Sequence, residues 1–271
     1  MEVFRGVVAA LVSGMLRPFA GRNAMLGLAP LGVLAGVGML WVFRRTSNQA
    51  AIRQVKRQLQ AHLYELRLFA DEPALIWRAQ AGLLAANARY LGLMLVPALV
   101  LTAPMAILFA HLEAFYGLEP LPLGQPALVT VQMNAALDPR LPPRLEAPDG
   151  IAVETPAVRD LEARQVSWRI RPLAPVSGYL RVVLPGEAVE KSVAAGSGPR
   201  YLSSRRVRPA LDLIWHPAER RLPAGVIDWV EVGYPPAKVH WLGMDLPWLV
   251  WLLGFSLLSA LVLKRRFGVS L

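Results

Sequence analysis

Residues 24–60 read AMLGLAPLGVLAGVGMLWVFRRTSNQAAIRQVKRQLQ and join two segments of opposite character. The first twenty residues, Ala24–Phe43, contain no ionisable side chain. The next seventeen carry five Arg or Lys and no Asp or Glu. A surface helix of a soluble protein keeps a polar face. The junction therefore predicts a membrane-spanning helix that stops at a cationic interface.

The composition of the whole chain agrees with a membrane protein. Its 271 residues leave room for one domain or two. Hydrophobic residues make up 55%, charged residues only 18%, and the mean hydropathy is +0.39, which is too apolar for an ordinary soluble protein. The chain has no cysteine, which excludes a disulfide framework and a thiolate metal site.

Three segments are candidates for bilayer spans: Ala24–Phe43, Tyr90–Leu112 and Leu246–Leu263. None contains Asp, Glu, Lys or Arg, so an ion path or proton relay within this chain is not expected. About twenty helical residues cross a hydrocarbon core of about 30 Å. The alternative is a set of buried core helices. Gly32 and Gly36 in the first segment permit close helix approach, either within one chain or between two copies.

The distribution of charge orients these spans. Residues 113–245 carry 15 basic and 15 acidic side chains, whereas residues 44–89 carry eight basic and three acidic ones, and the tail 264–271 adds three basic ones. Basic residues close to a span tend to remain cytoplasmic. We therefore expect the 44–89 segment and the C-terminus inside, and the N-terminus and residues 113–245 outside. Arg44 and Arg45 then end the first span at the cytoplasmic interface.

Residues 1–23 have two interpretations. The apolar run VFRGVVAALVSGML resembles a signal peptide, but Glu2 balances Arg5 and no small-residue cleavage site follows. Apolar residues recur at helical spacing up to Pro18, which favours an amphipathic helix in the outer interface. Its arginines, including Arg17 and Arg22, argue mildly against an outside N-terminus.

Residues 44–89 predict a cytoplasmic helical hairpin. A seam with three- and four-residue spacing, typical of a coiled coil, is formed by Ile52, Val55, Leu59, His62, Leu66 and Phe69. Asp71 or Glu72 suits the cap of a second helix, and Pro73 suits its first turn. No further helix breaker occurs before Pro97, so the second arm should continue into the second span. In the plainer interpretation, the two arms only pack on each other.

The hairpin also predicts a basic face, made by Arg53, Lys56, Arg57 and Arg67. These side chains suit lipid phosphates, an acidic partner helix or ribosomal RNA. Alternatively they only enforce topology. The segment lacks interleaved aromatic residues for base stacking, and DNA is not an expected partner.

Residues 113–245 predict antiparallel β structure. Short alternating runs include ALVTVQM, IAVETPAV, QVSWRIRPL, SGYLRVVLPG, EAVEKSVAAG and IDWVEVGYPP. Val166, Trp168 and Ile170 should share one face. A hairpin is expected across Pro185-Gly186. Six or seven such strands indicate an immunoglobulin-like β-sandwich without a disulfide.

Catalytic signals are absent from the sequence. The four histidines fall in three compartments of the predicted topology, and neither a glycine-rich phosphate loop nor a Gly-x-Ser-x-Gly elbow occurs. We therefore expect a non-enzymatic protein without a metal or other cofactor.

The order of segments resembles the YidC/Oxa superfamily of membrane-protein insertases. The resemblance covers residues 1–112, including the hairpin RRTSNQAAIRQVKRQLQAHLYELRLFADEPALIWRAQAGLLAANAR, and the last span. It implies three core spans around a groove open to the cytoplasm, and a hairpin that receives substrates or the ribosome. Arg44 and Arg45 at the groove mouth are the nearest counterparts of the basic residue that the bacterial family members place within the groove. The β domain between the second and third spans departs from the family pattern.

Together these patterns predict an α+β membrane protein with three transmembrane helices, a cytoplasmic antiparallel hairpin and an extracytoplasmic immunoglobulin-like sandwich, in the inner (plasma) membrane. Its segments are 1–23 (interfacial helix), 24–43 (first span), 44–89 (hairpin), 90–112 (second span), 113–245 (β domain), 246–263 (third span) and 264–271 (tail).

Two functions fit this architecture. An insertion or assembly factor for membrane proteins would present a polar groove floored by Asn87, Arg89 and Thr102 to nascent or unassembled chains. A structural or sensor subunit of a cell-envelope complex would instead bind its partners through the β domain.

Overall fold

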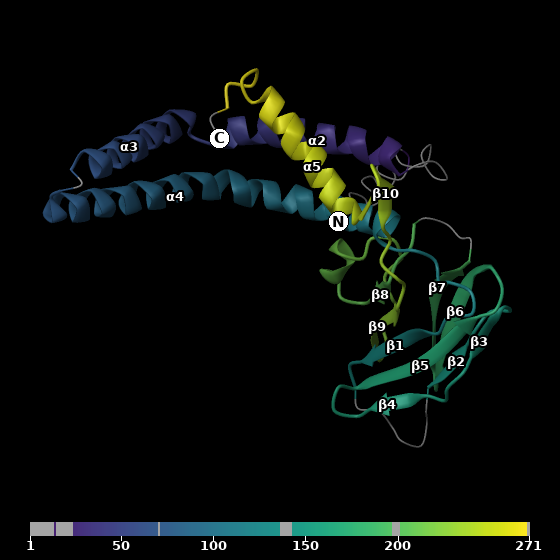
Figure 1. Ribbon diagram of the computed structural model, residues 1–271. Helices are drawn as coiled ribbons and strands as arrows, with labels where there is room; N and C mark the ends of the chain where they lie inside the picture. Colours follow the sequence, from purple (N-terminus) through teal and green to yellow (C-terminus); the bar gives the residue numbers. More distant parts are fainter. Residues whose placement is uncertain (1–13, 15–23, 70, 136–142, 197–200, 270–271) are drawn as a thin grey trace. The chain divides into compact units, whose positions relative to one another are not determined.

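The computed structural model describes residues 24–69, 71–135, 143–196 and 201–269, together with Gly14. The interfacial helix expected in residues 1–23 therefore lies almost entirely outside the described residues. The chain divides into two compact units. We call Leu28–Met105 with Leu249–Leu271 the helical unit, and Ala106–Trp248 the β unit (Figure 1).

Four α-helices are described outside the terminal region. They are α2 (Met25–Thr46), α3 (Gln49–Leu68), α4 (Pro73–Leu112) and α5 (Trp248–Leu263). Of the described helices, α2 and α4 with its π-helical extension Glu113–Gly117 are long and apolar enough to cross a membrane. The third expected span is a shorter apolar helix of 16 residues, which is about 24 Å long.

Local polar groups separate α2 from α3. The hydroxyl of Thr46 donates to the Val42 carbonyl at 2.9 Å, which satisfies a carbonyl at the end of α2. Asn48 caps α3, since its side-chain oxygen accepts the Ala51 N–H at 3.0 Å. After α3, the second arm begins at Pro73 and continues without a break to Leu112, through Pro97 and Pro104. At 40 residues α4 is about 60 Å long, roughly twice the thickness of a hydrocarbon core.

The β unit contains antiparallel sheets. One sheet has the strand order β3-β5-β1-β9-β8, with β4 pairing to the other end of β5; a second has the order β2-β6-β7; and β10 and β11 form a separate pair. The strands are β1 (Ala127–Met133), β2 (Arg144–Glu146), β3 (Ile151–Val153), β4 (Val158–Asp160), β5 (Gln165–Pro172), β6 (Val176–Leu184), β7 (Glu187–Ala195), β8 (Arg205–Val207), β9 (Ile227–Val232), β10 (Val239–Trp241) and β11 (Met244–Leu246).

The two larger sheets share one hydrophobic core. Val166, Trp168 and Ile170 on β5 are buried on one face, as their alternation predicted. Residues of β6 and β7, such as Leu180 and Val193, join them in a single cluster. The predicted hairpin is confirmed, because β6 pairs with β7 up to Leu184–Glu187 across Pro185-Gly186. Gly186 has a φ of 83°, a conformation that glycine adopts readily.

Candidate functional site: the helical hairpin and its basic face

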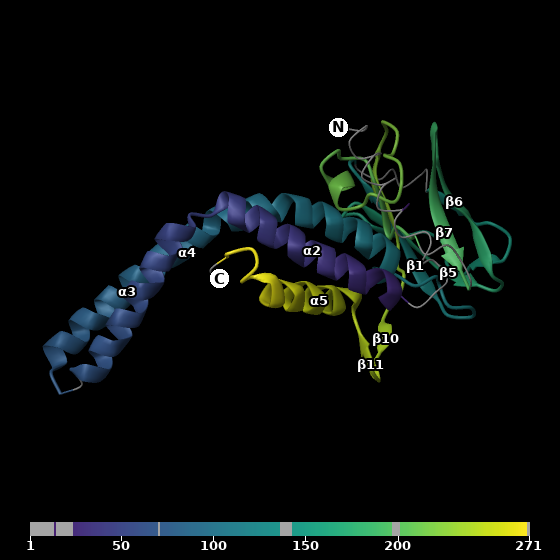
Figure 2. The same cartoon turned by 90° about the horizontal axis from the view of Figure 1, so that it is seen from above.

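The arms α3 and α4 form an antiparallel pair. Lys56 of α3 lies over the Tyr90 ring of α4, and His62 lies against Gly82, so the contacting positions move toward each other along the two arms. Figures 1 and 2 both show the arms side by side. On α3 the inward face buries Ile52 and Val55 completely, which agrees with the spacing in the sequence.

The face of α4 that meets α3 is made of small residues. Ala79 and Ala86 are buried, and Gly82 lies between them in the sequence and is half-buried. A Cβ added to Gly82 would lie 2.6 Å from Cε1 of His62, so the glycine makes room for the imidazole ring. Nδ1 of the same imidazole lies 2.9 Å from the carboxylate of Glu65 on its own helix. The histidine that interrupts the apolar seam is thus accommodated by a gap in the facing helix.

Replacing Gly82 with leucine should open the hairpin. The new side chain must displace the His62 ring, and overpacking of this kind typically costs about 1–3 kcal/mol. We expect faster proteolysis within α3 of the detergent-solubilised protein. Gly92→Leu is the matched control, because a Cβ at Gly92 of the same helix meets no atom within 4 Å. Equal proteolysis of the two variants would contradict this packing.

The basic residues of α3 lie outside the seam, with Lys56 on the flank that meets Tyr90 of α4. At 100° per residue, Arg53, Lys56, Arg57 and Arg67 fall within an arc of about 100°. The three arginines are exposed, and the ammonium group of Lys56 lies 5.8 Å from the Tyr90 ring centroid. We call these four residues the basic face.

Exposed apolar side chains accompany the basic face. Tyr64 falls within the same arc and is 69% exposed, and Leu63 at its edge is 51% exposed. Neither residue was predicted from the sequence, although the spacing from Arg57 and Arg67 places both on this side of the helix. The surface can therefore offer cationic and apolar contacts together, which suits an amphipathic partner or a lipid surface.

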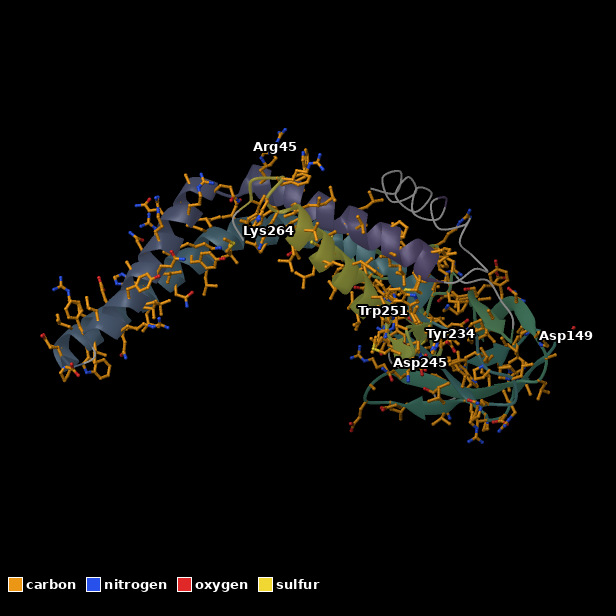
Figure 3. The ribbon with its side chains drawn as sticks, turned by 45° about the horizontal axis from the view of Figure 1, so that its top comes forward. Arg45, Asp149, Tyr234, Asp245, Trp251 and Lys264 are labelled. Carbon is orange, nitrogen blue, oxygen red and sulfur yellow. The ribbon has the colours of Figure 1, made fainter. Side chains whose placement is uncertain are left out.

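Arg44 and Arg45 are exposed in the last turn of α2. The guanidinium of Arg45 stacks over Trp41, 5.3 Å from the ring centroid. Tryptophan and arginine at the end of an apolar helix are typical of a membrane–water interface. Figure 3 shows Arg45, at the end of α2, and Lys264, directly after α5, on the same side of the two helices.

The helices α2 and α5 are in direct contact and run parallel. Gly32 lies against Phe255, and Gly36 lies against Ser259, so the contacting positions advance together along both helices. The Ser259 hydroxyl also contacts the Val33 carbonyl at 3.5 Å. The close approach permitted by the two glycines is therefore made within one chain. Because the helices are parallel, their C-terminal ends, with Arg44 and Arg45 on α2 and Lys264 directly after α5, lie on the same side of the helix pair.

The expected polar floor is not assembled in the structure. Asn87, Arg89 and Thr102 all lie on α4 and are exposed. Arg89 is displaced from Asn87 by about 200° around the helix axis, so the two point to opposite sides. The Thr102 hydroxyl donates to the carbonyl of Ala98 at 2.9 Å within the helix. These three residues cannot all line one groove formed against α4.

Much of the apolar surface of α4 is uncovered. Only 11% of its most apolar window is buried within the protein. Leu91, Leu95 and Leu99 are each more than half exposed. Such a surface requires lipid or a partner helix to cover it.

The β unit contains a buried ion pair that the sequence analysis missed. Lys191 on β7 is 0% exposed, and its ammonium group donates to Glu219, to the Ser203 carbonyl at 2.7 Å and to the Ser192 carbonyl at 3.2 Å. Burial lowers the pKa of the Lys191 ammonium, although the Glu219 carboxylate opposes this effect. Lys191 lies two residues after the buried Val189, so both side chains point to the same face of β7. This alternation could have identified Lys191 as a buried lysine from the sequence.

Comparisons with protein-family models, characterised proteins and solved structures gave no match. The resemblance to the YidC/Oxa superfamily consequently depends on the order and character of the segments. Among the described residues, no cluster of three or more His, Asp or Glu side chains is arranged to hold a metal ion.

Proposed function

We propose that the protein is an integral membrane protein that assists the insertion or assembly of other membrane proteins, without enzymatic activity. The observation that carries this proposal is the two-sided helix α3. One side packs on α4, and the other presents the basic face at the end of a helix pair continuous with apolar helices. Its substrates are nascent or unassembled membrane proteins, with the ribosome as a further partner.

The proposed membrane arrangement has three spans, with the N-terminus outside and the C-terminus in the cytoplasm, in the inner (plasma) membrane. The parallel contact of α2 with α5 supports it, because Arg44 and Arg45 then share a side with Lys264. The third span, α5, is about 24 Å long, and a short span is accommodated by local thinning of the bilayer.

The β unit would then lie outside the membrane. Its two sheets with a common core support an immunoglobulin-like sandwich that docks the external parts of client proteins. Close in the chain to the proposed span α5, His240 pairs with Asp245.

Neutralising the basic face should strongly reduce client contact. In a variant with Arg53→Gln, Lys56→Gln, Arg57→Gln and Arg67→Gln, photo-crosslinking of nascent membrane proteins from a probe at the exposed Tyr64 should fall about tenfold or more, because each cation near an acidic surface contributes about 1 kcal/mol. Crosslinked proteins are identified by mass spectrometry in intact cells.

Two controls accompany this experiment. Replacing the three arginines by lysine preserves the charge, and we expect normal crosslinking. Asp71→Cys provides the only thiol of the chain, and an impermeant maleimide should label it only after the membrane is opened. Unchanged crosslinking in the glutamine variant, or labelling of Asp71→Cys from outside, would refute the proposal.

The positions of the residues expected to form a polar floor favour a second function, that of a structural or sensor subunit. Asn87 and Arg89 point to opposite sides of α4, so these two described residues do not line one polar floor together. A structural or sensor subunit of a cell-envelope complex would instead cover the exposed apolar surface of α4 with a partner helix. Capture of one constant neighbour from Tyr64, in place of many clients, would support this alternative.

A further inference from the structure

The strands β10 and β11 form a two-stranded hairpin outside the common core of the β unit. Their turn is Leu242-Gly243, with φ values of 52° and 75°. Positive φ at both central residues defines a type I′ turn. Within the β unit, Figure 2 shows this hairpin projecting away from the two larger sheets.

Leucine is an unfavourable residue at the tip of this turn. Type I′ turns prefer Asn, Asp or Gly at the first central position, because an L-residue with a larger side chain pays about 1–2 kcal/mol in the left-handed region. Leu242 is nevertheless present and is 70% exposed. The fold gains almost no burial from this side chain, and a contact outside the β unit would account for a leucine at this position.

The rest of the hairpin is two-sided. His240 and Asp245 are paired across the strands, with His240 Nδ1 2.8 Å from the carboxylate, and they lie on one face. Met244 lies on the opposite face, across from Trp241, and is 45% exposed. Alternation along the strands places apolar side chains on this second face only. The hairpin is thus an amphipathic ribbon with an apolar tip.

Chain continuity ties this ribbon to the start of the proposed span α5. β11 ends at Leu246, and α5 begins at Trp248 with sixteen residues that contain no charge. From Leu242 to Trp248 the chain advances by six residues, which reach at most about 20 Å when fully extended. The tip therefore stays within about 20 Å of the start of α5.

We propose that the 239–246 hairpin is a membrane-interface anchor whose tip, Leu242 with Met244, inserts between lipid headgroups on the side of the β unit. The apolar tip reaches the boundary of the acyl chains, and the His240–Asp245 pair stays in the polar layer. The proposal rests on the insertion of α5 into the membrane, and it is independent of the client-binding role of α3.

The absence of native cysteine permits a direct test. Full-length protein carrying Leu242→Cys or Met244→Cys is labelled with an environment-sensitive fluorophore and reconstituted into phosphatidylcholine–phosphatidylglycerol vesicles. Leu161→Cys is the matched control, because Leu161 is a 63% exposed leucine on another turn of the β unit. Lipids spin-labelled at the headgroup and aqueous iodide, present on both sides, serve as the two quenchers.

We expect headgroup-labelled lipid to quench the probes at 242 and 244 and iodide to be largely excluded from them, with the reverse at 161. A further variant combines Met244→Cys with Leu242→Asn, which retains the turn because asparagine tolerates this conformation. Iodide quenching should rise about twofold in that variant, as the tip loses its apolar contact. Iodide access at 242 equal to that at 161, or protection from both quenchers through protein contact, would overturn the proposal.

Discussion

Replacing Glu219 with alanine is expected to destabilise the β unit by about 3–5 kcal/mol, the usual cost of removing one partner from a buried ion pair. The change leaves the Lys191 ammonium, which is 0% exposed, without its counter-charge. The buried, unpaired charge is removed if Lys191 loses its proton. For a lysine with an ordinary pKa near 10.4, this deprotonation costs about 4 kcal/mol at pH 7.4. Denaturant unfolding of the full-length protein measures the loss.

The pH dependence of the stability loss distinguishes an unpaired Lys191 charge from a general disruption of the β unit. Burial without the carboxylate lowers the folded-state pKa of Lys191 further below its unfolded value, so the unfolded state binds more protons. The stability deficit of Glu219→Ala should therefore shrink as the pH rises toward 10.4. Adding Lys191→Met removes the stranded charge and should recover most of the stability. A deficit that does not vary with pH, or no recovery in the double variant, would contradict this account.

Replacing Gly36 with leucine is expected to separate α2 from α5. A Cβ at this position would lie 2.1 Å from the Ser259 hydroxyl and 2.4 Å from the Ser256 carbonyl oxygen. Because the second of these atoms belongs to the backbone, a side-chain rotation cannot relieve the clash and the helices must move apart. We expect a loss of about 3 kcal/mol or more, seen as a lower melting temperature in detergent.

Gly38→Leu is the control for this change. Gly38 lies half a turn further along the same helix, and a Cβ there meets no atom within 4 Å. It carries the same change in composition and helix propensity as Gly36→Leu but should leave the melting temperature nearly unchanged. Similar melting temperatures for the two variants would show that α2 and α5 do not pack through Gly36.

Several elements were predictable because their signals are local. The three- and four-residue spacing of Ile52 and Val55 identified the inward face of α3, and both are fully buried. Alternation identified β5 and the β6–β7 hairpin. Short strands such as β2 and β8 were missed, because three residues carry too little periodicity and depend on partners far along the chain.

The candidate site was predictable only in part. The basic face of α3 follows from spacing within one helix, as do its exposed neighbours Leu63 and Tyr64. The facing row of Ala79, Gly82 and Ala86 was not identified, because small residues contribute little to a hydrophobic pattern. The use of Asn87 and Arg89 in one floor stays a prediction, and helix geometry weighs against it, since positions two residues apart on a helix point to nearly opposite sides.

By itself, the sequence determined where the apolar segments lie, where cationic residues end them, and which face of α3 is buried. These properties depend on neighbours within a few turns of the same chain. Only the tertiary structure decided that α2 contacts α5, more than 200 residues away, and that Lys191 pairs with Glu219. Such contacts depend on the shapes of two surfaces that meet after folding, and neither helix nor strand periodicity contains that information.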